Sequence, residues 1–361
     1  MKNKFFFLLM FLATSVLFLS CNNNDEPEEE QEPAVAYILN YGSYSGDKST
    51  ITAYNSETDA VSTDYYKTAN GVDMVSNAQY AYNYNGKIYF MGNNTDQVFW
   101  VDGVTFKQTE NGISTNIVKP RTCAGNGNYL YVSCWGGNIW SDESLSYIAK
   151  VNLTTKAVEK KIALPGGPES VVIANNKLYA ALNYKDSVAV INLSTDAVSY
   201  IATPAVTSYF VKDKSNNLYV SLVSTYSDYS DKEGIGYINT STDKLDATYR
   251  LEGVSSSYVN MMAPNADFSS LYVMTSAYDA NWILSGAVAV FDVATKSFKA
   301  QKFVEGISGL NGVAFYNNTV FCFVGETVTG NGIAKAYETN GTFIKDYETG
   351  ISPFMLLTVT D

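Results

Sequence analysis

Aromatic side chains in polar segments are the residues of this 361-residue sequence best suited to chemistry. Trp and Tyr combine a flat apolar ring with one polar group, so a group of them suits a large, partly planar ligand with many hydrogen-bonding groups. Segments rich in Ser, Gly and Asn are where a scaffold displays binding groups. The candidate ligand-binding aromatics are Tyr41, Tyr44, Trp135, Trp140, Tyr184, Tyr209, Tyr226, Tyr229, Tyr278 and Trp282.

Two polar residues in similar segments, Arg121 and Asn311, complete the candidate ligand-binding set. A guanidinium binds a carboxylate, a phosphate or an amide carbonyl through paired N–H groups. Arg121 has a second interpretation, an ion pair with an acidic residue of a neighbouring repeat. The aromatics have one too, since they could pack sideways on neighbouring loops and bind nothing.

Catalysis finds little support in the sequence. There is no histidine, which excludes His-based acid/base catalysis, His-ligated haem and the common zinc sites. We find neither a nucleophile–base pair nor a Gly-x-Ser-x-Gly motif. We therefore predict no catalytic residue, no cofactor and no enzymatic activity, although an enzyme that uses only Asp, Glu and Tyr is an alternative.

Metal and redox sites are also not predicted. Asp228, Asp231 and Glu233 carry oxygen ligands suited to calcium, but their spacing matches no defined loop, so solvated charges are favoured. After export processing three cysteines remain, an odd number without metal-ligand spacing. We expect Cys123, Cys134 and Cys322 to be buried free thiols.

The first residues have the pattern of an export signal. Lys2 and Lys4 precede an apolar run, residues 5–19, which is too short for a stable membrane span. Ser20-Cys21 follows, so we predict a signal peptide over residues 1–20 and lipidation of Cys21. The alternative is an ordinary secretory signal with an incidental cysteine. Residues 21–34 are rich in acids and predict a solvated tether.

Residues 35–361 contain a repeated strand pattern. Asn85-Gly86 and five similar turn sites each precede an alternating apolar strand, and a further such strand begins at Tyr37. Third strands end in Asn or Asp followed by Thr three residues later, as at Asn152 and Asn192, where the side chain can bond its own backbone. The repeats are about 40 to 53 residues apart, the length of a four-stranded propeller blade.

Seven such repeats predict an all-β fold, a seven-bladed β-propeller over residues 35–361. The chain begins in the second strand of blade 1, and residues 353–357 resemble a lone first strand. We therefore expect the C-terminal strand to join the N-terminal blade and close the ring, which removes two sheet edges. A pair of β-sandwiches would not need such complementary ends.

Blade topology divides the loops between two faces. One face carries short turns, and the other carries longer loops, residues 41–48, 134–144, 183–186, 223–233 and 275–285. Most of the candidate aromatics fall in these loops, and the remaining candidates fall in other connections on the same face. A net charge of −12 without a basic stretch argues against a nucleic-acid partner.

The blade pattern over residues 35–361 resembles the YVTN/YncE-type seven-bladed propellers of bacterial surface proteins. Three stretches, namely residues 38–42 with 49–54, residues 84–102 and residues 131–135, resemble more narrowly the BtuG-like cobalamin-binding lipoproteins of Bacteroidetes. The acidic segment after Cys21 resembles the surface-export signal of Bacteroidetes lipoproteins. These resemblances imply an outer-membrane, lipid-anchored, surface-exposed protein that captures cobalamin or a related corrinoid for a TonB-dependent receptor. The alternative is a glycan- or protein-binding surface propeller without a transport role.

Overall fold

The computed structural model describes residues 35–44, 46–224, 233–251, 261–278, 284–327 and 329–359, all within one compact unit. For residues 276–278 and 284–285 it describes the backbone alone. The predicted signal peptide, Cys21 and the acidic tether lie outside these ranges. In the described part of the chain, no helix is long and apolar enough to cross a membrane.

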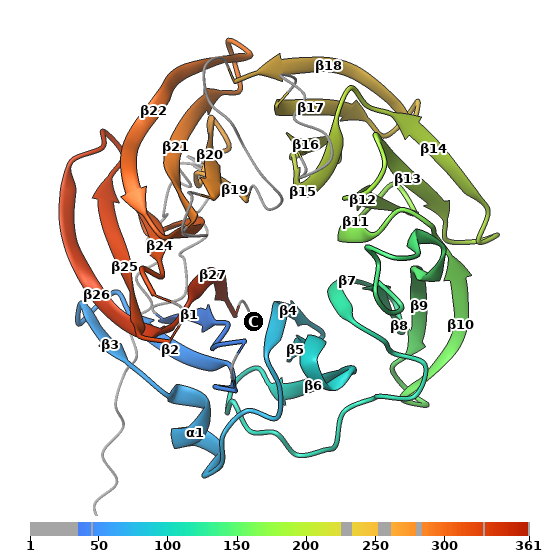
Figure 1. Cartoon of the computed structure of the whole chain (residues 1–361), viewed down its shortest axis with the longest axis horizontal. Coiled ribbons are helices and arrows are strands. Elements are labelled where there is room, and N and C mark those ends of the chain that lie inside the picture. The colour runs from blue at the N-terminus through green and yellow to red at the C-terminus, as the bar shows by residue number, and fades with distance from the viewer. Residues whose placement is uncertain are drawn as a thin grey trace, which may run out of the picture. The chain divides into compact units, whose positions relative to one another are not determined.

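The strands form six four-stranded sheets and one three-stranded sheet, which are the seven blades of a propeller (Figure 1). The first strands of neighbouring blades contact one another all the way round the ring, in the order β4, β7, β11, β15, β19, β23, β27 and back to β4. The predicted fold class is therefore confirmed.

The closing blade also forms as predicted. Strand β27 is hydrogen-bonded to β1 in antiparallel register, with Leu357 opposite Tyr37 and Met355 opposite Leu39. The C-terminal strand thus becomes the innermost strand of the blade that the N-terminal strands build. The strands of this first blade are β27 (Pro353–Thr358), β1 (Val35–Asn40), β2 (Thr50–Asn55) and β3 (Ala60–Ser62).

The other blades follow in chain order, each from its innermost strand outward. Blade 2 has β4 (Ala78–Tyr84), β5 (Lys87–Gly92) and β6 (Gln97–Asp102). Blade 3 has β7 (Pro120–Asn126), β8 (Tyr129–Cys134), β9 (Tyr147–Asn152) and β10 (Ala157–Ala163). Blade 4 has β11 (Pro168–Ala174), β12 (Lys177–Leu182), β13 (Ser187–Asn192) and β14 (Val198–Ala202).

The last three blades complete the ring. Blade 5 has β15 (Val206–Lys212), β16 (Leu218–Val223), β17 (Gly234–Asn239) and β18 (Lys244–Arg250). Blade 6 has β19 (Met262–Pro264), β20 (Ser270–Tyr278), β21 (Leu284–Asp292) and β22 (Ser297–Ser308). Blade 7 has β23 (Leu310–Tyr316), β24 (Thr319–Val324), β25 (Asn331–Glu338) and β26 (Phe343–Ile351).

Blade 2 departs from the predicted four-stranded pattern. Residues 103–119 take the place of its outer strand, but they make only one isolated bridge to β6, between Ile113 and Val98. A short helix, α1 (Tyr65–Asn70), precedes this blade, and the Asn70 side chain bonds Gln108 N and Phe106 O. Backbone groups that lack a strand partner are thus satisfied by a side chain.

The turns on one face follow the predicted side-chain chemistry. The Oδ1 atoms of Asn152 and Asn192 each accept hydrogen bonds from the backbone N–H groups two and three residues later. Asp292 Oδ1 accepts from Thr295 N in the same way. These turns reverse the chain from the third to the fourth strand without help from the core.

Two of the predicted two-residue hairpin turns are wrong. In blade 5 the loop spans residues 213–217, between the last paired residues Lys212 and Leu218. In blade 6 it spans residues 265–270, between Pro264 and Leu271. Asp213 and Asn265 each bond backbone N–H groups within their loop, and these bonds stabilise the longer turn.

The core consists of layers between adjacent blades. Tyr131 and Ile148 of blade 3 pack with Leu178 and Ala180 of blade 4 in one buried cluster, and similar clusters lie between other blades. Cys123, Cys134 and Cys322 are buried and free, as predicted. Burial raises the pKa of the Cys134 and Cys322 thiols to about 12, so both stay protonated at neutral pH.

Candidate ligand-binding site at the mouth of the propeller axis

The innermost strands share an irregularity at the long-loop end. In six blades the register between the first and second strands shifts there, so that one or two residues of the first strand have no register partner on the second. Such a bulge redirects a side chain. Blades 2 to 5 each have two such residues, whereas blades 7 and 1 have one. The first or only one in each of these blades is Gln79, Arg121, Glu169, Ser208, Asn311 and Phe354.

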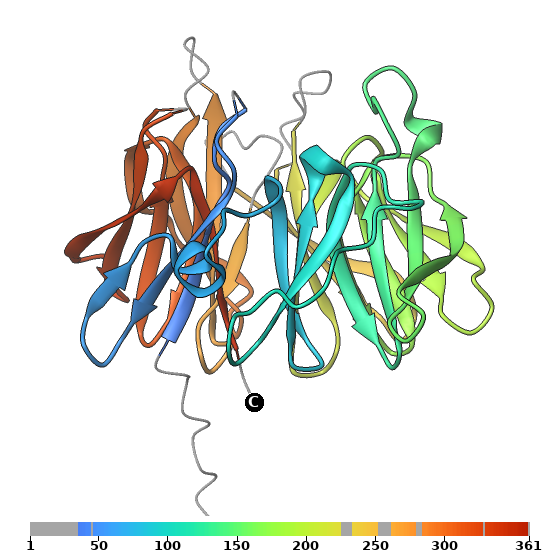
Figure 2. The same ribbon diagram turned by 90° about the horizontal axis from the view of Figure 1, so that it is seen from below.

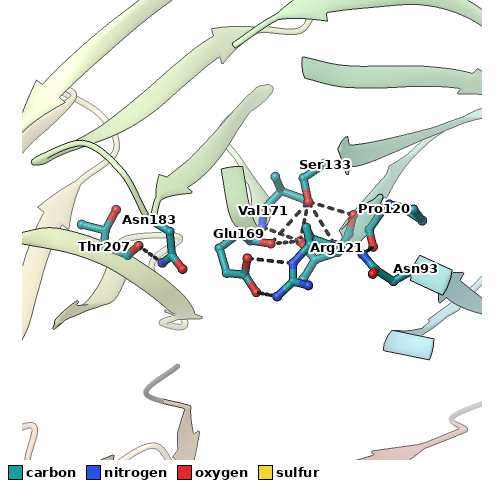
Figure 3. A network of polar contacts seen from close by, with 9 residues as sticks. Asn93, Pro120, Arg121, Ser133, Glu169, Val171, Asn183 and Thr207 are labelled. Carbon is teal, nitrogen blue, oxygen red and sulfur yellow. Dashed lines mark hydrogen bonds and ion pairs between the residues drawn. The ribbon is translucent and has the colours of Figure 1, made fainter. Parts of the chain in front are cut away.

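Two of these residues form an ion pair between neighbouring blades (Figure 3). Arg121 of β7 donates from Nε to Glu169 Oε2 at 2.8 Å and from Nη2 to Oε1 at 2.5 Å. Only 11% of the Arg121 side chain and 6% of the Glu169 side chain are exposed. Burial alone would lower the pKa of Arg121, but the Glu169 carboxylate outweighs it and raises this pKa. The bridge to a neighbouring acid, one of the two interpretations of Arg121, is therefore confirmed.

An aromatic group lies against this ion pair. The Arg121 guanidinium lies 4.2 Å from the centre of the Trp135 ring, a cation–π contact. Trp140 and Tyr184 each pack against Trp135 in an edge-to-face arrangement, with ring centres 6.0 Å apart. The structure thus brings together four predicted site residues from blades 3 and 4.

Blade 1 contributes two more predicted residues nearby. Tyr41 is buried against Tyr44, with ring centres 5.2 Å apart, whereas Tyr44 is 86% exposed. Burial and the neighbouring Tyr44 raise the pKa of Tyr41 to about 12. The Arg121 charge acts on the pKa of Tyr41, so the blade 1 tyrosines lie within electrostatic range of the ion pair.

Tyr80 and Tyr209 directly follow the bulge residues Gln79 and Ser208 on the first strands of blades 2 and 5. Burial raises the pKa of Tyr209, and the charges of Glu169 and Arg121 also act on it. Burial likewise raises the pKa of Tyr80, with a further contribution from Tyr209. The predicted residue Tyr209 therefore lies within electrostatic range of the ion pair.

A cavity of about 450 Å³ lies beside this cluster, in the loops of blades 3 and 4. Trp140, which is 70% exposed, forms one wall and Tyr184 another. Asp142 and Glu143 add carboxylates, and the Asp142 side chain is held by bonds from Ser144 N and Oγ. These hydrogen bonds lower the pKa of Asp142, so it remains ionised at neutral pH.

The remaining predicted residues either do not join the Arg121 group or lie outside the described part of the chain. Asn311 stands at the equivalent place in blade 7, where its Nδ2 donates to Pro353 O rather than joining the Arg121 group. Tyr226, Tyr229 and Trp282 lie outside the described residues, as does the side chain of Tyr278. Among the calcium candidates, Asp228 and Asp231 also lie outside them. Glu233 is buried, so the expectation that it is a solvated charge is wrong.

Sequence reasoning misses Glu169, which is the partner of Arg121, and the neighbouring residues of blade 2. The blade pattern places Glu169 on this face without marking it as a site residue, and it does not single out Gln79 or Tyr80. A signal is present, because Pro120-Arg121 and Pro168-Glu169 occupy equivalent positions in consecutive repeats. In the described ranges, no group of His, Cys, Asp or Glu side chains could hold a metal ion.

Comparison with family models gives a match to "Domain of unknown function (DUF5074)" over residues 35–228, more than half of the chain. The chain belongs to the DUF5074 family. No curated protein sequence matches it. The family match covers strands β1 to β16, which are blades 2 to 4, three strands of blade 1 and two strands of blade 5, and it includes the Arg121–Glu169 pair.

Solved structures similar to this DUF5074 protein share its fold at low sequence identity. A quinoprotein alcohol dehydrogenase-like protein from Bacteroides thetaiotaomicron VPI-5482 has a TM-score of 0.65 and 16% identity, covering 90% of this chain and 78% of that chain. A protein from Bacteroides fragilis NCTC 9343, provisionally assigned as a 6-phosphogluconolactonase, has a TM-score of 0.65 and 12% identity, covering 91% and 99%. At such identities the likeness shows the propeller fold alone and establishes no enzymatic activity.

Proposed function

We propose that this DUF5074 protein is a surface-anchored binding protein whose long-loop face captures a ring-containing ligand rich in hydrogen-bonding groups. One observation carries the proposal: Arg121 is bonded along one edge by Glu169 and lies over the Trp135 ring, and Trp140 and Tyr184 pack edge-to-face with Trp135. A charged donor held against aromatic rings supplies both parts of such recognition, orientation by hydrogen bonds and contact area by the rings.

Exposed apolar side chains support the same face. Scattered exposed apolar residues are normal on a protein surface, but a gathering of them marks an interaction site. Five of the large exposed hydrophobics in the described residues belong to the long-loop connections of blades 1 to 3, namely Tyr44, Val72, Val75, Trp140 and Leu145. Tyr44 and Trp140 of this set also contact other aromatic rings of the site.

The first ligand candidate is cobalamin or a related corrinoid, passed on to a TonB-dependent outer-membrane receptor. The support is the sequence resemblance to cobalamin-binding lipoproteins, together with aromatic and hydrogen-bonding groups that suit a large, partly planar ring. Because the sequence has no histidine, the protein supplies no imidazole to cobalt. A bound cobalamin therefore keeps its own lower base, and its affinity comes from ring contacts and hydrogen bonds.

Membrane attachment through a lipid on Cys21 is part of the proposal. The described chain starts at Val35, at the end of β1 that lies on the short-turn face (Figure 2). A tether that joins there leaves the long-loop face free of its attachment point. Such an arrangement suits an outer-membrane protein that presents its binding face to a ligand or to a receptor.

Calorimetry of the purified residues 22–361 against cyanocobalamin tests the proposal. Trp140→Ala removes an exposed ring without opening the core, so the fold is kept while affinity falls by about 1–2 kcal/mol, up to thirtyfold. The control is Phe343→Ala, which removes an exposed ring at the short-turn end of the outer strand β26 of blade 7 and leaves the affinity unchanged. Absence of heat with cyanocobalamin and with cobinamide contradicts corrinoid capture.

A glycan is the second candidate, favoured by the cavity beside Trp140. Sugar rings pack on exposed aromatic faces, and carboxylates such as Asp142 and Glu143 accept hydrogen bonds from sugar hydroxyls. The same calorimetry against soluble polysaccharides separates the two candidates. Heat with a polysaccharide and none with any corrinoid assigns the face to glycan binding.

A further inference from the structure

The Arg121 guanidinium leaves part of its hydrogen-bonding capacity unused. A guanidinium has five N–H donors, and Glu169 takes one on Nε and one on Nη2. Nη1 makes no hydrogen bond to another described residue. This nitrogen is not one of the buried side-chain atoms that lack a partner, so the exposed part of the side chain includes it. Two N–H groups of Nη1 are therefore available to a ligand.

The orientation of these free donors is fixed. Glu169 holds the guanidinium along one edge with two bonds, and Trp135 covers one of its faces at 4.2 Å. Because the N–H groups lie in the plane of the guanidinium, an acceptor must approach Nη1 in that plane. The site is thus rigid before any ligand arrives, which lowers the entropy cost of binding.

The net charge of the Arg121–Glu169 pair determines which hydrogen-bond acceptors bind to Nη1. The carboxylate of Glu169 cancels the charge of Arg121, so an approaching anion gains little net attraction and must still lose its water. An uncharged carbonyl oxygen loses less hydration and still accepts a hydrogen bond from a charged donor. The geometry favours a neutral acceptor over a carboxylate.

We propose that the Arg121–Glu169 pair recognises a neutral amide group of the ligand, and that Glu169 is the positioning residue that discriminates against carboxylates. This inference rests on the proposed binding role of the long-loop face and adds the chemistry of one contact. Amides of this kind occur on the side chains of corrinoids and on N-acetylated sugars.

Side-chain NMR with two small probe compounds tests the proposal. Arg121 and Arg250 are the only arginines in the sequence, so a protein with ¹⁵N-labelled arginine gives two Nε–H signals, which Arg250→Lys assigns. Propionamide and propionate are the probes, alike in shape and different in charge. We expect propionamide to shift the Arg121 signal saturably with a dissociation constant on the order of 10 mM, and propionate to bind at least tenfold more weakly.

Glu169→Gln should reverse the order in which the two probes bind. The amide oxygen of the new side chain still accepts a bond from Arg121, but the positive charge is no longer cancelled, so propionate becomes the tighter probe. Glu57→Gln removes the same charge from an exposed turn on the opposite face and leaves the wild-type order. The wild-type comparison alone still tests the proposal if the Glu169 variant does not fold.

Equal or tighter binding of propionate by the wild type overturns the proposal, and so does no shift of Arg121 with either probe. Cyanocobalamin and N-acetylglucosamine then identify the source of the amide, by which of them shifts Arg121 at the lower concentration. A response to propionamide but to neither larger compound keeps the amide site and contradicts the proposed ligands. Failure of the ligand assignment is thus distinguishable from failure of the amide site.

Discussion

At the scale of single residues, the Arg121–Glu169 pair has a structural role besides its place in the binding site. It links blade 3 to blade 4 at the level where the first strands bulge. A buried ion pair adds little net stability compared with an apolar pair, but loss of one partner leaves the other charge buried and uncompensated. A single substitution in the pair should therefore destabilise the fold strongly, and substitution of both residues should destabilise it only weakly.

We predict that Arg121→Met lowers the free energy of unfolding by about 3–5 kcal/mol, because Glu169 is left charged and buried. The double variant Arg121→Met with Glu169→Leu should recover most of this loss. Urea denaturation of the three proteins measures the coupling between the two positions. Equal destabilisation by the single and the double variants would show that the charge left on Glu169 is not the cause.

At the scale of the element, the third-to-fourth strand turns also join neighbouring blades. Asp243 in the blade 5 turn accepts hydrogen bonds from Lys177 Nζ and Tyr179 Oη of blade 4. Asp59 in the blade 1 turn is bonded in the same way by Lys345 and Tyr347 of blade 7. Each of these aspartates has a positive φ, which the tight turn requires. One turn thus serves both the hairpin within a blade and the contact between blades.

Asp292, in the third-to-fourth strand turn of blade 6, makes the stability of the protein depend on pH. Hydrogen bonds from Lys299 and from Thr295 lower its pKa from 3.8 to about 2. Because the folded pKa lies below the unfolded one, the stabilisation is present above pH 4 and is lost as the pH falls toward 2. We predict that Asp292→Asn, which keeps the turn, is less stable than the wild type at pH 7 and equally stable near pH 2.

Thermal unfolding of both proteins between pH 2 and 7 measures the difference. Asp246→Asn is the matched control, because Asp246 is an exposed aspartate on strand β18 of the adjacent blade and makes no ion pair with another described residue. This control should leave the pH profile unchanged. A stability difference for Asp292→Asn that is the same at pH 7 and pH 2 would contradict the role of its charge.

At the scale of the whole molecule, the ring depends on the strand that closes it. Strand β27 is bonded to β1 within blade 1 and packs against β23 and β4 of the two neighbouring blades. Leu357 is buried in the cluster between blades 1 and 2, where Phe354 and Met355 also pack. Its removal would expose both an apolar surface and the unpaired edge of β1.

We predict that deletion of residues 353–361 abolishes the cooperative thermal transition or lowers the melting temperature by more than 10 °C, because several buried side chains are lost together. The control is a deletion of residues 360–361, which keeps all of β27 and should melt like the wild type. A protein without residues 353–361 that melts at the wild-type temperature would refute the closure of the ring by this strand.

The sequence by itself determined the repeat, the closing strand and the turn chemistry. These depend on local rules: alternation of apolar residues, Asn and Gly at positions of positive φ such as Asn85 and Gly86, and Asx side chains that bond the adjacent backbone. It also indicated the free thiols, because the three cysteines are an odd number and their spacing fits no metal site. A short segment contains all the information that such features require.

Only the tertiary structure decided the composition of the site. Arg121 and Glu169 are 48 residues apart and meet because β7 and β11 carry the same bulge, a shift of one strand against another that the residues within one strand do not specify. Residues 103–119 form no outer strand, although the repeat predicts one, and the side chain of Asn70 at the end of α1 bonds two of their backbone groups. Contacts of this kind arise from the assembled blades, so one-dimensional patterns predict the scaffold better than the site.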